Sequence, residues 1–257
     1  MGKVSYDFSG QTVLVTGGSR GIGFGVAKGF AKAGADVVIL SSGDGEDAAK
    51  ALSVFGSARA VRADITDRNQ IIKALSGIER IDVLVNNAGL ERATPMDDPD
   101  DAVEDTFARI IDINVNGTFL MTRHALPRMR AGGRIILTAS IWSRTAVPEF
   151  SAYVCSKHAN LGFMRSMAHE LGPRGINVNA VCPGWVRTEA AMLSLAKMSE
   201  ATGKPEADLL EEITGAQVLG GLLEPDDMAA LYLFLASDAA CDITGQAYML
   251  DRGEVMA

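Results

Sequence analysis

A regular alternation of short apolar runs with helical stretches constrains this chain more than any other feature. Seven runs are rich in Val and Ile and nearly continuous in hydrophobicity, as strands covered on both faces are. We expect strands at 12–16, 36–40, 58–62, 81–85, 134–138, 177–181 and 247–250, and helices at 21–33, 46–54, 67–76, 100–130, 150–171 and 226–236. This order predicts a doubly wound α/β fold around a parallel sheet of about seven strands, similar to a Rossmann fold.

The 257 residues contain no long linker or low-complexity segment, so we predict one domain over 1–257. One segment, at about 188–223, breaks the alternation. It is helical in composition, rich in Met, Ala and Glu, and has no strand pattern. Such an excursion is typical of a lid over a ligand, although an ordinary surface helical hairpin gives the same pattern.

Charge and composition exclude several classes of protein. The formal net charge of −8 argues against a nucleic-acid partner, because a phosphate backbone attracts an excess of Lys and Arg. No run of eighteen apolar residues predicts a membrane span, and residues 1–10 do not resemble a secretory signal. Cys155, Cys182 and Cys241 lack metal-ligand spacing. We therefore expect no metal site, and reduced thiols in a cytoplasmic protein.

A glycine-rich turn follows the first predicted strand. Residues 16–23 read Thr-Gly-Gly-Ser-Arg-Gly-Ile-Gly and lead into the first predicted helix. Gly17, Gly21 and Gly23 would let the backbone approach a pyrophosphate closely, and the helix N-terminus attracts its negative charge. A purely structural turn would need similar glycines, but the position between strand and helix favours dinucleotide binding.

The end of the second strand favours NADP over NAD. An acidic residue there would bind the ribose 2′-hydroxyl and repel a 2′-phosphate. This chain has Ser41 and Ser42 instead, and Arg20 in the nearby glycine turn suits a phosphate. Asp44 and Glu46 follow closely and oppose this choice, so NAD remains the alternative.

Tyr153 and Lys157 lie four residues apart in a helical stretch and therefore share one face. A tyrosine is a poor acid or base at neutral pH unless a nearby cation favours its phenolate. Ser140 lies just past the strand at 134–138, on the edge of the sheet where open α/β folds bind their ligands. Its hydroxyl could hold a substrate oxygen.

Taken in order, these pieces resemble the short-chain dehydrogenases/reductases over essentially the whole chain. The glycine turn is joined by Asp64 after the third strand, the turn at 86–89 and the segment 183–188. The family's catalytic four match Asn114, Ser140, Tyr153 and Lys157. The resemblance implies cofactor contacts at Gly17, Ser19, Arg20, Gly21, Ile22, Gly23, Ser41, Ser42, Asp64, Ile65, Asn87, Ala88, Gly89, Tyr153, Lys157, Pro183, Gly184, Val186 and Thr188.

The resemblance also implies a role for each catalytic residue. Tyr153 gives or takes the proton, and Ser140 hydrogen-bonds the substrate oxygen. Lys157 lowers the pKa of Tyr153 and hydrogen-bonds the ribose. Asn114 interrupts a helix and holds a water that relays protons to Lys157, and Thr188 contacts the nicotinamide carboxamide.

The substrate pocket is expected between the turn after 89, the stretch 141–151 and the excursion. These segments offer Glu91, Arg92, Trp142, Arg144, Phe150, Trp185 and Arg187. We select Trp142 and Trp185 as an apolar or sugar-stacking wall, and Arg92 and Arg144 as holders of an anionic group. The segment 185–188 also resembles the 3-hydroxybutyrate dehydrogenases. However, Trp142 stands where those enzymes have a His, so their substrate is not carried over.

These features predict an NAD(P)-dependent oxidoreductase that acts on a secondary alcohol or ketone of a small polar substrate, such as a sugar, polyol or hydroxy acid. One alternative is a 3-oxoacyl thioester reductase, and another is a non-catalytic nucleotide-sensing protein on the same fold. The resemblance implies a homo-oligomer, a tetramer or dimer, formed through the helices at 100–130 and 150–172. Arg252 replaces the Gly usual in the family, and we expect it to reach a neighbouring subunit.

Overall fold

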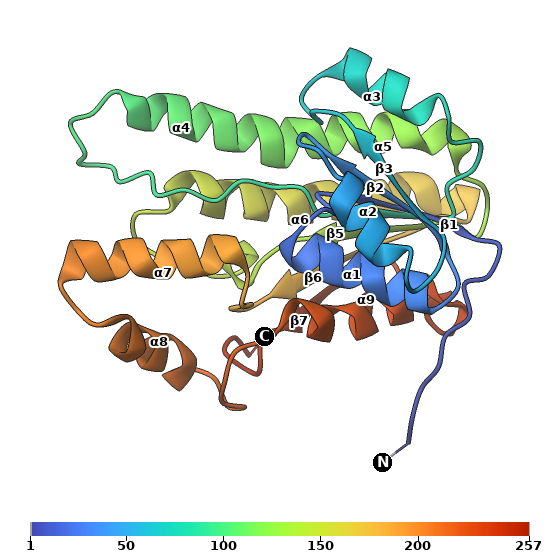
Figure 1. Cartoon of the computed structure of the whole chain (residues 1–257). Helices are drawn as coiled ribbons and strands as arrows, with labels where there is room; N and C mark the ends of the chain where they lie inside the picture. Colours follow the sequence, from blue (N-terminus) through green and yellow to red (C-terminus); the bar gives the residue numbers. More distant parts are fainter. Residues whose placement is uncertain (1, 257) are drawn as a thin grey trace.

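Seven parallel strands form one sheet in the order β3-β2-β1-β4-β5-β6-β7 in the computed structural model, which describes residues 2–256 (Figure 1). The strands are β1 (Thr12–Thr16), β2 (Asp36–Ser41), β3 (Ala58–Arg62), β4 (Val83–Asn86), β5 (Arg134–Thr138), β6 (Asn177–Pro183) and β7 (Ala247–Leu250). The predicted Rossmann-like sheet is thus confirmed. The strand order reverses between β1 and β4, and a ligand cleft is expected at such a switch point.

Alternate residues of the inner strands face two separate hydrophobic cores. Leu14 and Leu84 point to the core formed with α3 (Arg68–Leu75), α5 (Thr118–Ala125) and α6 (Ser151–Leu171). Val13 and Val15 point to the opposite core. The second core is formed with α1 (Gly21–Lys32), α2 (Glu46–Leu52) and α9 (Ala229–Ala236). Burial on both faces explains why the strands read as continuous apolar runs.

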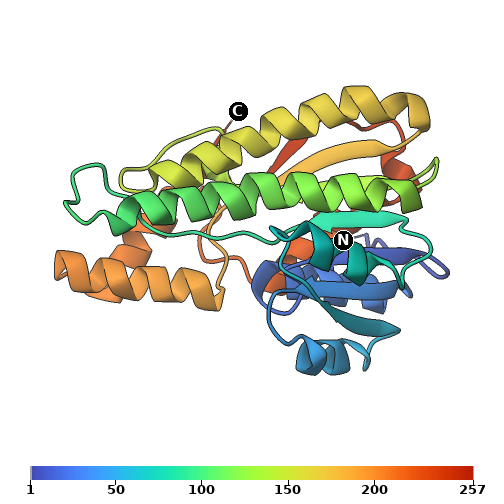
Figure 2. The same ribbon diagram turned by 90° about the horizontal axis from the view of Figure 1, so that it is seen from above.

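The predicted helix at 100–130 is not continuous. It consists of α4 (Ala102–Ile111), a π-helical segment (Asp112–Gly117), α5 and a 3₁₀ turn at Leu126–Arg128. Figure 2 shows this run lying alongside α6. At the π segment the Thr118 hydroxyl donates to the Asn114 carbonyl at 2.8 Å, and Gly117 packs closely against Ile65. Such bulges are frequent at functional sites.

The excursion after β6 is a pair of helices, α7 (Glu189–Thr202) and α8 (Glu206–Gly215). Thr188 begins α7, and its hydroxyl accepts a hydrogen bond from the Ala191 N–H at 3.1 Å. Gly203 ends α7 with a φ of +70°, a conformation that favours glycine. Across the described residues 2–256, no helix has the length and apolarity needed to cross a membrane.

Arg252 contacts the end of the excursion within its own chain. Its guanidinium donates to the carbonyls of Gly220 and Leu222 at 3.0 and 3.2 Å. Leu219 N–H in turn donates to the Arg252 carbonyl at 2.9 Å. Arg252 ties the C-terminal turn to the end of the excursion, because these carbonyls lie within reach of its fork of donors. Its contact with a neighbouring subunit stays a prediction.

Candidate active site

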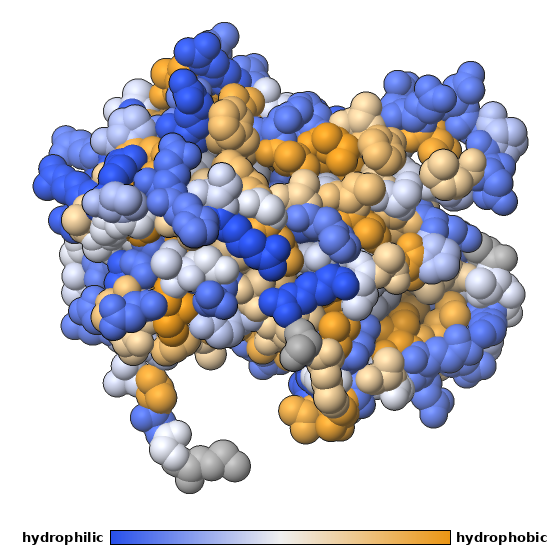
Figure 3. All heavy atoms as spheres, turned by 180° about the vertical axis from the view of Figure 1, so that it is seen from behind, coloured by the Kyte–Doolittle hydropathy of each residue, from blue (hydrophilic) through white to orange (hydrophobic). Residues whose placement is uncertain are grey.

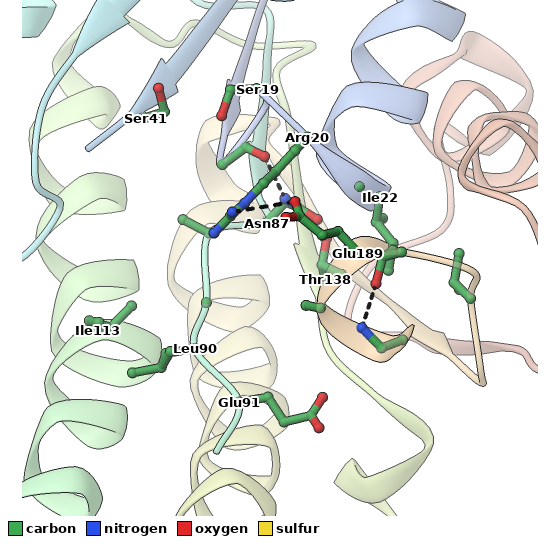
Figure 4. Close-up of a pocket in the computed structure, with 18 of the residues that line it drawn as sticks. Ser19, Arg20, Ile22, Ser41, Asn87, Leu90, Glu91, Ile113, Thr138 and Glu189 are labelled. Carbon is green, nitrogen blue, oxygen red and sulfur yellow. Dashed lines mark hydrogen bonds and ion pairs between the residues drawn. The ribbon is translucent and has the colours of Figure 1, made fainter. Parts of the chain in front are cut away.

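A cleft of about 880 Å³ opens at the carboxyl ends of the strands where their order reverses (Figure 4). It brings together almost every residue predicted to contact a cofactor. The lining includes Gly17, Ser19, Arg20, Gly21, Ile22, Ser41, Ser42, Asp64, Ile65, Asn87, Ala88, Gly89, Tyr153, Lys157, Pro183, Gly184, Val186 and Thr188. Gly23 is the exception. A single cleft thus joins segments that are spread between residues 17 and 194 of the chain.

The glycine turn fits a bound pyrophosphate. Gly17 and Gly21 have φ values of +64° and +54°, which side chains rarely adopt. Gly23 does not line the cleft, and a Cβ there would lie 2.3 Å from the Gly17 carbonyl oxygen. Its glycine is needed for packing beneath the turn rather than for ligand contact. No side chain caps the start of α1, so its first N–H groups are available for an anion.

The turn after β4 braces the glycine turn. The Thr16 hydroxyl accepts hydrogen bonds from the N–H groups of Asn87 and Ala88 at 2.9 and 3.0 Å. The Asn87 amide donates back to the Thr16 and Gly17 carbonyls at 3.1 and 3.3 Å. These bonds hold the two loops at the switch point at a fixed separation.

The end of the cleft beside β2 carries charges of both signs. Ser41 and Ser42 line it at the tip of β2, together with the acidic Asp44 and Asp47. The Arg20 guanidinium lies 3.7 Å from the Glu189 carboxylate at the start of α7, and both side chains are more than four-fifths exposed. Exposed ion pairs of this kind are weak, so Arg20 can exchange its partner for an anionic ligand.

Arg109, which sequence reasoning missed, lies beside Asp64 on this cleft. Its guanidinium is 3.2 Å from the Asp64 carboxylate, which also accepts bonds from the Thr66 N–H and hydroxyl at 2.9 and 2.8 Å. Burial alone would raise the pKa of Asp64, but the Thr66 bonds and the Arg109 charge outweigh burial and lower it. Arg109 lies on α4 and is separated from Asp64 along the chain by α3 and β4, and no sequence motif marks the pair.

The opposite end of the cleft brings together Ser140, Tyr153 and Lys157. Ser140 follows β5, and its hydroxyl accepts a hydrogen bond from the Trp142 N–H at 3.2 Å. Tyr153 and Lys157 lie on the first turns of α6. The Lys157 ammonium donates to the Thr138 carbonyl at 2.8 Å and lies 5.3 Å from the centre of the Tyr153 ring. Three of the four side chains predicted to be catalytic thus line the same part of the cleft.

Burial dominates the acid–base properties of this part of the cleft. It raises the pKa of Tyr153, the nearby Glu91 carboxylate raises it further, and a hydrogen bond with Ser140 opposes both. Burial lowers the pKa of Lys157 to about 8, against the opposing influence of Cys182 and Glu91. The predicted lowering of the Tyr153 pKa by Lys157 is therefore overridden in this environment, because desolvation disfavours both charged forms.

Asn114 lies behind the cleft rather than on its surface. Its amide oxygen accepts from the Leu90 N–H at 2.7 Å, and its amide nitrogen donates to the Leu90 carbonyl and the Ser156 hydroxyl, both at 2.9 Å. The side chain is buried. It joins the π segment to the loop after β4 and to α6, so its contacts in this structure are those of a positioning residue.

Three of the four predicted substrate residues line the cleft: Arg92, Trp142 and Trp185. The prediction that Arg144 lines the substrate pocket is wrong. Its guanidinium donates to the carbonyl of Ala247 in β7 at 3.0 Å, and Arg144 does not line the cleft. Trp142 meets the Tyr153 ring edge to face, with centroids 5.8 Å apart. Trp142 thereby forms an aromatic wall next to the Tyr153 hydroxyl, which is predicted to be catalytic.

The end of the cleft beside Tyr153, called the substrate end below, also contains Glu91 from the loop after β4 and Ser194 from α7. The Ser194 hydroxyl donates to a Glu91 carboxylate oxygen at 3.5 Å. Burial raises the pKa of Glu91, and Ser194, Lys157 and Arg92 oppose the increase. The sequence predicted Glu91 as a wall residue, but Ser194 was missed because its position depends on how α7 folds back over the cleft.

Comparison with known proteins decides the family. A family model described as enoyl-(acyl carrier protein) reductase, of the short-chain dehydrogenase/reductase type, matches residues 17–254. The chain belongs to the short-chain dehydrogenase/reductase family. The resemblance predicted from the motifs is thus confirmed, and this member of the family is an oxidoreductase.

Relatives of this dehydrogenase/reductase act on small polar molecules. The chain is 35% identical in sequence to the D-beta-hydroxybutyrate dehydrogenase of Cupriavidus necator, over 96% of this chain and 98% of the relative. It is 36% identical to the L-rhamnose 1-dehydrogenase (NAD(P)(+)) of Azotobacter vinelandii, over 95% and 96%. The solved L-sorbose reductase of Gluconobacter frateurii, complexed with NADPH and L-sorbose, superposes with a TM-score of 0.90 at 26% identity, over 99% and 100%.

Proposed function

We propose that this chain transfers a hydride reversibly between NADP(H) and the alcohol or carbonyl carbon of a small polar substrate. The observation that carries the proposal is the convergence of Ser140, Tyr153 and Lys157 on one wall of the cleft that also contains the glycine turn. A degenerate nucleotide sensor on the same fold would not need this wall intact. The proposal therefore favours catalysis over sensing.

Each residue of the wall has a defined task in this reaction. The Tyr153 hydroxyl donates its proton to the carbonyl oxygen in reduction and removes it from the alcohol in oxidation. The Ser140 hydroxyl hydrogen-bonds that same oxygen, and the Lys157 ammonium favours the phenolate form of Tyr153 as it develops. A nicotinamide bound here supplies or accepts the hydride, while the protein provides position and electrostatics.

NADP is the proposed cofactor, with NAD as the alternative. No acid occupies the tip of β2, where Ser41 and Ser42 line the cleft, and Arg20 lines the same cleft. The L-sorbose reductase was solved with NADPH, which supports the same choice. Asp44 and Asp47 oppose it through their negative charge, although they lie on the open rim where solvent screens them.

We also propose that the excursion at 188–223 acts as a lid. Five residues of α7 line the cleft: Glu189, Ala190, Ala191, Leu193 and Ser194. Figure 1 shows α7 and α8 at one end of the molecule, beyond the tips of the strands. Closure of this pair over a bound substrate would exclude water from the reacting atoms.

An absorbance assay at the reduced-nicotinamide band tests the proposal. Purified protein is given NADPH or NADH with a panel containing ketoses, hydroxy acids with their oxo forms, and an acyl thioester. We expect turnover with a small polar ketone and a higher kcat/KM with NADPH. Turnover restricted to the thioester would instead favour the acyl reductase alternative. Tight cofactor binding without turnover on any compound would favour the sensor.

We further propose that the chain forms a homo-oligomer, a tetramer or dimer, through α4 and α6. Phe107 and Phe119 are 38% and 45% exposed on α4 and α5, and Phe119 packs against Phe163 of α6. Figure 3 shows apolar side chains gathered in the upper half of one face, at the height that α4 and α6 occupy in Figure 1. Light scattering coupled to gel filtration measures the assembly, and a monomer at micromolar concentration would contradict it.

A cytoplasmic location remains part of the proposal. Cys155, Cys182 and Cys241 are free thiols in the structure, as is usual in a reducing compartment. Fractionation of the source cells tests this location, and recovery of the protein outside the cytoplasmic fraction would contradict it.

A further inference from the structure

The proton transfer proposed above gives no task to Glu91, a charged side chain of the cleft. Glu91 follows Leu90 in the loop after β4 and lines the substrate end. Figure 4 shows its carboxylate extending from this loop. It is close enough to Tyr153 and Lys157 to influence the charge of both. An acidic group beside the reacting atoms must affect which substrates can enter.

The Glu91 carboxylate can accept more hydrogen bonds than it receives. An ionised carboxylate accepts about four hydrogen bonds. Within residues 2–256, the side chain accepts one, from the Ser194 hydroxyl, and that bond is long at 3.5 Å. Poorly hydrated acceptors need donors, and a ligand in the cleft is positioned to provide them.

We propose that Glu91 is a specificity-determining residue that selects neutral polyhydroxylated substrates, of the sugar or polyol class, over anionic hydroxy acids. Its carboxylate accepts hydrogen bonds from hydroxyl groups on carbons next to the reacting carbon. The inference rests on the proposed function and narrows its substrate class.

The surroundings of Glu91 support a neutral substrate. A substrate carboxylate would face Glu91 across a partly desolvated space, where like charges repel strongly. Arg144, expected to hold such an anion, is turned away from the cleft, and Arg92 is exposed and donates to the Glu91 backbone carbonyl at 2.8 Å. Trp142 and Trp185 offer flat apolar surfaces that suit the C–H face of a sugar.

Kinetics on three probes test the inference. The wild type, Glu91→Leu and Glu91→Gln are assayed with saturating NADPH on L-sorbose, acetoacetate and 2-butanone. We expect Glu91→Leu to raise KM for L-sorbose about tenfold or more, because the variant loses a hydrogen bond to a charged group. The effect on 2-butanone should be much smaller than that on L-sorbose, and activity on acetoacetate should improve. Glu91→Gln, which keeps one acceptor oxygen, should be intermediate.

Two controls separate specificity from damage. Glu79→Gln removes an exposed carboxylate remote from the cleft and should match the wild type on all probes. The affinity for NADPH, measured by fluorescence titration, should be unchanged in both Glu91 variants, since the substrate end is altered and the glycine turn is not.

The outcomes distinguish the inference from the function on which it rests. A wild-type preference for acetoacetate over L-sorbose overturns the inference, as does an equal loss on all three probes in Glu91→Leu. Either result leaves the proposed hydride transfer standing. Failure of the wild type to reduce any of the carbonyl compounds, with NADPH or NADH, overturns the proposed function itself.

Discussion

At the scale of single residues, burial separates Tyr153 and Lys157 from an ordinary helical pair. The sequence predicted both, together with Ser140, because their order along the chain matches a family motif. It did not predict their pKa directions, which depend on burial and on Glu91 from a distant loop. Arg109 was missed for a similar reason: its importance comes from its contact with Asp64, and no local pattern records that contact.

The lowered pKa of Lys157 predicts a pH-dependent contribution to stability. Its pKa is about 8 in the folded protein, against an ordinary value of 10.5. Between these values the unfolded chain binds more protons, so the free energy of unfolding rises with pH. Below about pH 8 both states carry the proton and the contribution is constant. Lys157→Met should therefore flatten the rise between about pH 8 and pH 9.5.

Urea denaturation of the wild type and Lys157→Met across this range measures the effect. Lys73→Met, an exposed lysine on α3, is the matched control and should keep the wild-type slope. Parallel pH profiles for the wild type and Lys157→Met would show that Lys157 does not titrate with a lowered pKa.

At the scale of elements, the strands could be predicted more completely than the helices. Four of the seven strands were predicted to the residue. Two of them, β1 and β5, are buried runs bounded by sharp changes in hydropathy, whereas β3 and β7 lie at the edges of the sheet and are partly exposed. The predicted helix at 100–130 hid the π segment at Asp112–Gly117, since a bulge keeps nearly the same hydrophobic period. The break was anticipated at Asn114 only through the family resemblance.

Asn114→Ala should destabilise the protein and reduce kcat. The substitution removes hydrogen bonds to both backbone groups of Leu90 and to the Ser156 hydroxyl, in a buried place. Leaving buried groups unpaired costs about 1–3 kcal/mol. Urea denaturation and steady-state kinetics measure the two effects. Asn116→Ala, on the exposed side of the same segment, should be nearly neutral. Equal behaviour of the two variants would contradict the positioning role of Asn114.

At the scale of the whole molecule, the topology determines where chemistry can occur. The reversal of strand order between β1 and β4 opens the cleft, and loops from six segments of the chain converge on it. The sequence predicted this arrangement because alternating strands and helices permit few topologies. It did not predict the attachment of the excursion to the C-terminal turn through Arg252, since side-chain reach across a fold has no sequence signature.

Arg252→Gly should loosen the end of the excursion with little loss of global stability. Arg252 has a φ of +57°, which glycine adopts without strain, so the backbone gain offsets part of the lost hydrogen bonds. Hydrogen exchange should accelerate at 216–223 and KM for substrate should rise. Arg130→Gly, on an exposed turn at the opposite end of the sheet, serves as the control for removing a surface guanidinium. Unchanged exchange at 216–223 would contradict the tether.

The central claim, that Tyr153 transfers the proton in a cofactor-binding cleft, is tested most directly by one variant with two readouts. Tyr153→Phe removes a hydroxyl and keeps the ring that packs against Trp142. Turnover should fall on the order of 10²- to 10⁴-fold, the usual contribution of a general acid or base. NADPH affinity by fluorescence titration should stay within about threefold of the wild type, because the glycine turn is untouched. Near-normal turnover in this variant, with cofactor binding intact, would contradict the account.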